Sequence, residues 1–199
     1  EEGTTLRVFR RQQFLELAEN CRLDSYSRNL SVVLMADIDL TDVDFAGIPI
    51  FCGSFDGSGH TISGLSITPD GSNVGLFRYV DDSALIQNLT VSGEVTPDGS
   101  RSAVGGIAGH NAGRILNCFF DGTVSGANDV GGIAGINAVT GILDGCHASG
   151  SVTGSHRIGG VVGNNLGVIR SCNNRSQVNT TAEENQITLS DLSLDTITG

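Results

Sequence analysis

The side chains best placed to do chemistry are carboxylates in two short stretches. Asp37, Asp39, Asp42 and Asp44 form the first stretch, and the pair Asp81–Asp82 forms the second. Asp37 and Asp39 alternate with apolar residues, so both would face one side of a strand and could bind Ca²⁺ through their oxygens. Carboxylates in such stretches also cap turns or face water, and we favour that interpretation over a Ca²⁺ site.

Other reactive groups do not occur at the spacings that known sites require. The sequence has no Cys-x-x-Cys, His-x-x-x-His or His-Glu-x-x-His pattern for a metal, and no Gly-x-Ser-x-Gly pattern for a nucleophilic serine. The four histidines fall at different places of the repeat described below, so we expect no shared metal site; they are His60, His110, His147 and His156. We therefore assign no catalytic, cofactor-binding or metal-ligating residue and expect no cofactor.

The composition excludes several classes of function. All eleven basic residues are Arg, which rules out a P-loop lysine, a Schiff base and a Lys–Asn cross-link. The formal net charge is −11, so we expect binding neither to nucleic acid nor to an anionic membrane. No apolar run reaches the roughly 18 residues of a membrane-spanning helix, so we expect no membrane insertion.

The elements that would position any site come from an internal repeat. Copies of a Val-Gly-Gly-Ile-Ala-Gly pattern begin at Val104, Val130 and Ile158, and a degenerate copy begins at Val74, so the steps are 30, 26 and 28 residues. Glycines and turn residues break each copy into short apolar runs, which excludes stacked helices and favours short strands. Periods of this length in strand-forming sequence predict an all-β chain folded as a parallel β-helix of about seven coils.

The alignment of the copies predicts which side chains stack inside the coils. In this register Leu65, Leu89, Cys118, Cys146 and Cys172 form one inward ladder. Equivalent residues of adjacent coils lie about 4.8 Å apart, and parallel Cβ vectors keep the Cβ atoms further apart than a relaxed disulfide allows. We therefore expect an interior stack of thiols, in which any Cys–Cys bond would be strained. The glycines and asparagines are expected at corners that need left-handed backbone angles.

The two ends of the chain differ from the repeats. Apolar residues at helical spacing over 11–20 predict an amphipathic helix that caps the exposed end of the coils, with a partner-binding helix as the alternative. The sequence begins at Glu1 without Met or an apolar signal region, so we expect a processed form or a piece of a longer protein. The expected single domain covers 1–199, divided into an N-terminal strand–helix cap at 1–30, coils at 31–180, and a last strand or start of a further coil at 181–199.

The repeat resembles a known family. The strings Gly-Gly-Ile-Ala-Gly-x-Asn and Gly-x-Ile-x-Asn-Cys, followed by Gly-x-Val-Ser-Gly, are similar to the GLUG-type repeat of bacterial cell-surface and adhesin-like proteins, over roughly residues 5–180. The resemblance implies a right-handed parallel β-helix in a large secreted or cell-wall-attached protein, and it carries no shared catalytic residues. Gly145 departs from the pattern because Asn is usual before the Cys, which puts the geometry of that corner in question.

The function expected from these observations is a non-catalytic extracellular module of a larger surface protein, acting in adhesion, in display or as a spacer. Its partner would be a host or cell-surface protein or a glycan. Two alternatives stay open. A glycan-binding module would use polar outer faces, although the chain has no Trp and only Tyr26 and Tyr79. A polysaccharide lyase or glycosidase would need facing carboxylates and long loops around a groove, and the tight coils leave little chain for such loops.

Overall fold

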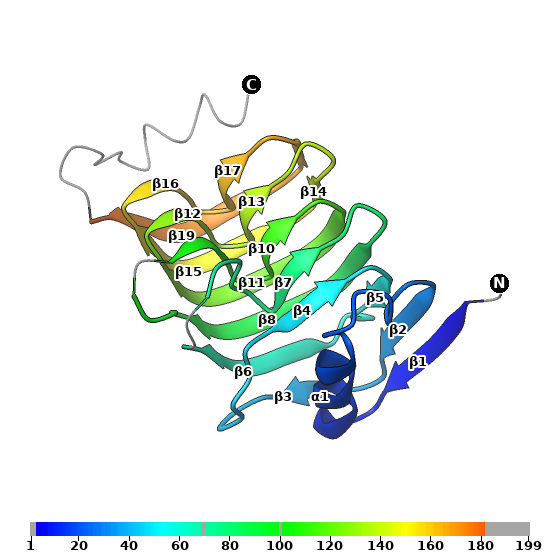
Figure 1. Cartoon of the computed structure of the whole chain (residues 1–199). Coiled ribbons are helices and arrows are strands. Elements are labelled where there is room, and N and C mark those ends of the chain that lie inside the picture. Colours follow the sequence, from blue (N-terminus) through cyan, green and yellow to red (C-terminus); the bar gives the residue numbers. More distant parts are fainter. Residues whose placement is uncertain (1–2, 69–70, 100, 182–199) are drawn as a thin grey trace.

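The chain winds into a parallel β-solenoid (Figure 1). The computed structural model describes residues 3–68, 71–99 and 101–181. Every pair of strands in these ranges runs parallel. About six turns are stacked, which agrees with the expected parallel β-helix of about seven coils. The last strand or start of a further coil expected at 181–199 lies outside the described residues apart from Thr181.

The stacked strands form one large sheet and two smaller ones. The large sheet has two columns of strands that meet in the long strands β8 and β11. Its first column is β1 (Thr4–Val8), β2 (Leu30–Leu34), β5 (Ser54–Asp56), β8 (Leu85–Val95), β11 (Arg114–Ser125), β14 (Ile142–Asp144) and β18 (Val168–Arg170). Its second column adds β3 (Ile38–Asp39), β6 (Thr61–Ile67), β15 (His147–Gly154) and β19 (Asn173–Thr180).

The two smaller sheets complete each turn. One contains β4 (Ile48–Phe51), β7 (Phe77–Val80), β10 (Ala108–Asn111), β13 (Ala134–Asn137) and β17 (Val162–Asn165). The other contains β9 (Ser102–Gly105), β12 (Asn128–Gly131) and β16 (His156–Gly159).

The predicted repeat is confirmed by the pairing. Val74 bridges to Val104, Val104 pairs with Val130, and Val130 pairs with Ile158. The four starts identified in the sequence are therefore neighbours in one ladder. Because side chains alternate along each strand, this register sends the same columns of apolar residues inward in every turn. Ile86, Ile115 and Leu143, for example, are 0% exposed.

The predicted cysteine stack is confirmed in part. Leu89 pairs with Cys118, and the neighbouring pairs place Cys146 next to Cys118 and Cys172 next to Cys146. Cys118 and Cys146 are buried, Cys172 is half-buried, and all three are free thiols. Leu65 was placed wrongly: it pairs with Gly93 because a register shift separates it from Ile62 in β6.

Residues at the corners of the coils are selected for two reasons, a left-handed backbone angle, which the sequence predicted, and close packing of the backbone, which it did not. Asn88, Asn117, Gly145 and Ser171 occupy the same corner of successive turns with φ between 50° and 67°, which is the left-handed conformation expected. Gly145 thus keeps the geometry of the Asn that it replaces. Gly106 of the Gly-Gly pair has no left-handed φ. It is required because an added Cβ would lie 2.4 Å from the carbonyl oxygen of Gly132 and from the Phe120 ring.

A short helix covers the N-terminal end of the solenoid (Figure 1). The predicted cap is confirmed as β1 followed by α1 (Arg11–Asn20), whose first turn is closed by Gln13 Oε1 accepting from the backbone N–H groups of Phe9 and Arg10. Its apolar face buries Phe14, Leu17 and Ala18. Among the described residues, no helix is long and apolar enough to span a membrane.

Candidate functional site

The first acidic stretch shapes turns around β3. Asp37 Oδ1 accepts from the backbone N–H of Thr61 at 2.9 Å and lies 3.1 Å from His60 Nδ1. Asp39 Oδ1 accepts from the hydroxyl of Thr41 at 2.6 Å and from its backbone N–H at 2.9 Å. These hydrogen bonds lower the pKa of both carboxyls, the largest contributions being the Thr61 amide for Asp37 and the Thr41 hydroxyl for Asp39. Both carboxylates are therefore already engaged by donors from the chain.

The remaining acidic residues do not converge either. Asp42 sits in a turn with a left-handed φ of 59°, and Asp81 accepts from the Ser83 hydroxyl at 2.6 Å. Within the described ranges, no group of three or more His, Cys, Asp or Glu side chains is arranged to hold a metal ion. The Ca²⁺ alternative therefore has no ligand set in this part of the chain.

The histidines lie in four different surroundings. His60 meets Asp37, His110 stacks on Tyr79, His147 stacks on Phe119, and His156 pairs with Asn128 along the third sheet. Burial lowers the pKa of His110, whose Nδ1 is buried and has no hydrogen-bond partner among the described residues. The two aromatic–histidine stacks are features that the sequence analysis did not identify.

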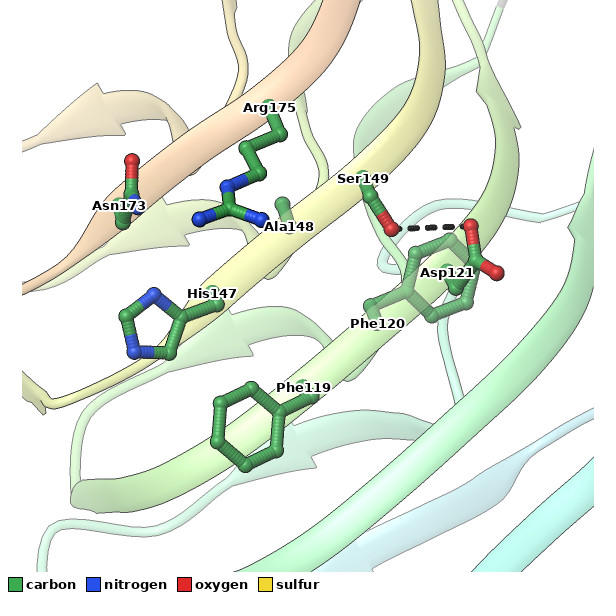
Figure 2. A pocket seen from close by; sticks show the side chains of 8 residues that line it. All are labelled: Phe119, Phe120, Asp121, His147, Ala148, Ser149, Asn173 and Arg175. Carbon is green, nitrogen blue, oxygen red and sulfur yellow. Dashed lines mark hydrogen bonds between the residues drawn. The ribbon is translucent and has the colours of Figure 1, made fainter.

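One of these stacks borders a shallow hollow on the outer face of the large sheet (Figure 2). The hollow has a volume of about 380 Å³ and spans three successive strands, β11, β15 and β19. Its lining residues are Phe119, Phe120, Asp121, His147, Ala148, Ser149, Asn173 and Arg175. The inward-facing Phe120 and Ala148 belong to the floor, while the outward residues form two columns along the solenoid axis.

The first column is aromatic and ends in an amide. Phe119, His147 and Asn173 are partners in the register of the three strands. The Phe119 and His147 rings are stacked with centroids 5.0 Å apart and planes 8° from parallel. Phe119 is 41% exposed, so this ring is a large apolar surface open to solvent.

The second column is polar and carries both signs of charge. Asp121, Ser149 and Arg175 are partners in the same register. The Ser149 hydroxyl donates to Asp121 Oδ1 at 2.9 Å. Figure 2 shows the Arg175 guanidinium reaching from β19 toward β15, into the space between the two columns. His147 makes no hydrogen bond with Ser149 in the described structure, so a Ser–His–Asp relay is not assembled.

The sequence analysis missed this site because its residues lie outside the repeat pattern. Cys118 was identified as inward, and alternation therefore placed Phe119 outward, next to His147 in the following copy. The alternation of side chains thus indicated that Phe119 and His147 are outward neighbours. It did not indicate a site, because outward residues vary from copy to copy and form no motif. Of the four histidines, His147 lines the hollow and the other three lie elsewhere.

Comparison with known proteins identifies the repeat. Residues 100–125 match the model of the GLUG motif. The chain is 38% identical over 136 residues to Halomucin of Haloquadratum walsbyi, and this match covers 60% of the chain and 2% of the relative. It is 34% identical over 96 residues to a provisionally named Gly-rich membrane protein of Evansella cellulosilytica, covering 42% of the chain and 11% of that relative.

A solved structure supports the fold. A provisionally named immunoglobulin A1 protease from Bacteroides ovatus superposes with a TM-score of 0.58 and 17% sequence identity, covering 90% of this chain and 85% of that one. At this identity the likeness concerns the fold alone. The repeat copies in the sequence, their pairing in the structure and the matched motif agree, and the chain is a parallel β-solenoid that carries the GLUG motif.

Proposed function

We propose that the chain is a non-catalytic module of a larger extracellular protein that is secreted or attached to a cell wall. In that protein the module acts as a spacer and presents its outer face for adhesion. The observation that carries the proposal is the continuous stacking of about six turns in register. The matched relatives support the larger context, because the chain covers only 2% and 11% of their lengths.

The stacked turns give the module a defined length and stiffness. Each turn adds about 4.8 Å along the axis, so six turns extend roughly 29 Å. Neighbouring turns are joined by parallel ladders and by buried side-chain columns, so bending the axis would break many hydrogen bonds at once. Such a body suits a spacer that also presents its outer columns to a partner.

The absence of catalysis in this proposal rests on how the reactive groups are used. The Asp37 carboxylate accepts a hydrogen bond from the backbone of Thr61, 24 residues further along the chain. The carboxylates of Asp39 and Asp81 accept hydrogen bonds from residues two positions ahead and so stabilise local loops. The buried thiols of Cys118 and Cys146 donate to backbone carbonyls. A lyase or glycosidase would instead need carboxylates that face each other across a groove.

The test has two measurements on the purified chain. Incubation with pectin-type and mucin-type glycans should release no new reducing ends and no unsaturated products, and release of either would overturn the non-catalytic role. Beads coated with the chain should adhere to cells or to glycan-coated surfaces more than beads coated with chain that has been unfolded and blocked. Equal retention of the two kinds of bead would contradict the adhesive role.

A further inference from the structure

The hollow on the outer face contains a positive charge that has no partner in the described part of this strongly acidic protein. Arg175 has no hydrogen-bond or ion-pair partner among the described residues, whereas the chain as a whole has a formal net charge of −11. Its guanidinium lies over the hollow beside Asn173 and His147 (Figure 2). An exposed guanidinium that is held by no carboxylate of the described residues can bind one from a ligand.

We infer that this hollow binds an acidic carbohydrate, a glycan whose sugar ring carries a carboxylate. The inference rests on the proposed adhesive role and names the ligand class for it. Arg175 would bind the carboxylate through two parallel N–H···O bonds, the exposed Phe119 ring would contact the C–H face of a sugar, and Asn173 and Ser149 would bind hydroxyl groups.

The distribution of charge gives the ligand a direction. Asp121 and Arg175 are two turns apart in one column, which corresponds to about 10 Å along the axis. The Asp121 carboxylate repels an anionic group at its own end and accepts hydrogen bonds from hydroxyls. The sugar carboxylate is therefore directed to the β19 end of the hollow, and neutral hydroxylated parts of the glycan lie toward β11.

The backbone under the hollow favours a glycan over an acidic peptide. β15 is paired on both sides, with β11 and with β19, so its N–H and C=O groups are already used in ladders. A peptide lying across this face could not add as a strand, which is how extended peptides usually gain affinity from sheets. Over β11 and β15, recognition must therefore come from side chains alone, and an aromatic ring flanked by hydrogen-bonding groups suits a sugar.

The experiment measures binding of the intact chain to an array that holds matched neutral and carboxylated glycans. We expect binding to the carboxylated members that weakens with added salt. Arg175→Ala should weaken it by about tenfold or more, and Arg175→Lys should weaken it less, because a lysine keeps the charge and loses the paired geometry. Phe119→Ala should also weaken binding. Gln177→Ala, at another exposed position of β19, serves as the matched control and should leave it unchanged.

The outcomes separate this inference from the proposed function. Equal binding to neutral and carboxylated glycans, or unchanged binding by Arg175→Ala, would overturn the assignment of an acidic sugar. Binding to acidic peptides without binding to glycans would also overturn it, while leaving the non-catalytic adhesive role in place. Cleavage of an array member would instead refute the proposed function. Circular dichroism melting of each variant confirms that it is folded before binding is compared.

Discussion

Asn137 is the central member of a ladder of amides inside the solenoid, and its removal gives a sharp test of how the turns are joined. The side chain is 0% exposed. Its Nδ2 donates to Asn165 Oδ1 at 2.9 Å and to the carbonyls of Gly141 and Val168 at 3.2 Å. Its Oδ1 accepts from Asn111 Nδ2 at 3.0 Å. One residue therefore links three successive turns.

The expected cost of Asn137→Ala follows from these contacts. An amide nitrogen has two hydrogens, so the side chain makes about three hydrogen bonds, each contributing roughly 1 kcal/mol net. In the variant, the Gly141 carbonyl and one Nδ2 hydrogen of Asn111 stay buried but lose their hydrogen-bond partner. Leaving these two groups unsatisfied costs about 1–2 kcal/mol more. We expect the free energy of unfolding to fall by about 4–5 kcal/mol.

Asn165→Ala is the matched control, because Asn165 occupies the same position in the last described turn and is exposed. Water replaces the hydrogen bonds lost there, so we expect a cost of about 1 kcal/mol. Equilibrium unfolding in urea, followed by circular dichroism, measures both variants, and equal m-values make the comparison valid. A loss below about 1 kcal/mol for Asn137→Ala, or equal losses in the two variants, would refute the reasoning.

Three further predictions concern the cysteine column and its corners. Cys146→Asp should unfold the middle turns, because it buries an unpaired charge. Cys172→Asp, at the half-buried position of the last turn, should lower the melting temperature less. An unchanged melting temperature for Cys146→Asp would mean that the cysteine column is not interior. A Cβ added at Gly145 would lie 2.4 Å from the Asn117 amide oxygen, so the Asn117 side chain must turn aside in any variant. Gly145→Asn should cost about 1 kcal/mol or less in urea unfolding, since Asn tolerates the left-handed corner, as Asn117 does with φ 50°, while Gly145→Val should cost roughly 2 kcal/mol more; equal costs would contradict a left-handed corner. Burial raises the pKa of Cys118 from 9.0 to about 12, so the unfolded thiol ionises first. Stability from this thiol is complete below about pH 9 and is lost as the pH rises toward 12, by about 1.4 kcal/mol per pH unit. Cys118→Val should reduce that alkaline slope in urea unfolding, and an identical slope would contradict it.

The other thiols of the column differ in their ionisation. The neighbouring thiol of the more exposed Cys172, together with burial, raises the pKa of Cys146. The Cys146 thiol beside it stabilises the Cys172 thiolate and lowers the pKa of Cys172. The last turn therefore carries the thiol that reacts most readily, as expected where the interior begins to open to solvent.

The fold could be predicted largely from the repeat, and the errors occurred where the repeat is irregular. Val104, Val130 and Ile158 begin closely similar patterns, so alignment of the copies was enough to predict their register. Leu65 lies in β6, whose sequence lacks that pattern, and the register shift after Ile62 has no signal in the spacing of apolar residues. Local irregularities of this kind are set by packing between turns.

The candidate site was less predictable for a different reason. Inward residues repeat because every turn fills the same interior, whereas outward residues are free to differ. Phe119, His147 and Asn173 share one outward column and have no chemical type in common. Only the three-dimensional register shows that they lie together, and only the structure shows that Arg175 has no partner among the described residues.

The N-terminal cap tests the idea that the open ends of the solenoid must be covered. Phe14 of α1 is 0% exposed, and its ring centroid lies 5.5 Å from that of Phe45 and 6.5 Å from that of Phe55. Phe14→Ala should lower the free energy of unfolding by about 3–5 kcal/mol, because the cavity cannot be filled by a flexible neighbour. Phe9→Ala, at a ring that is 53% exposed, is the control and should change it by less than about 0.5 kcal/mol.

The region of the solenoid that Phe14→Ala destabilises distinguishes a residue of the cap from an ordinary core residue. If α1 covers the end of the coils, loosening it exposes apolar side chains and strand edges there, and these surfaces associate. Hydrogen exchange should then accelerate first in β3 and β4, which α1 contacts, while β13 stays protected. Sedimentation should show association that grows with concentration. Uniform acceleration along the whole solenoid, with the variant still monomeric, would show that Phe14 stabilises the fold without acting as a cap.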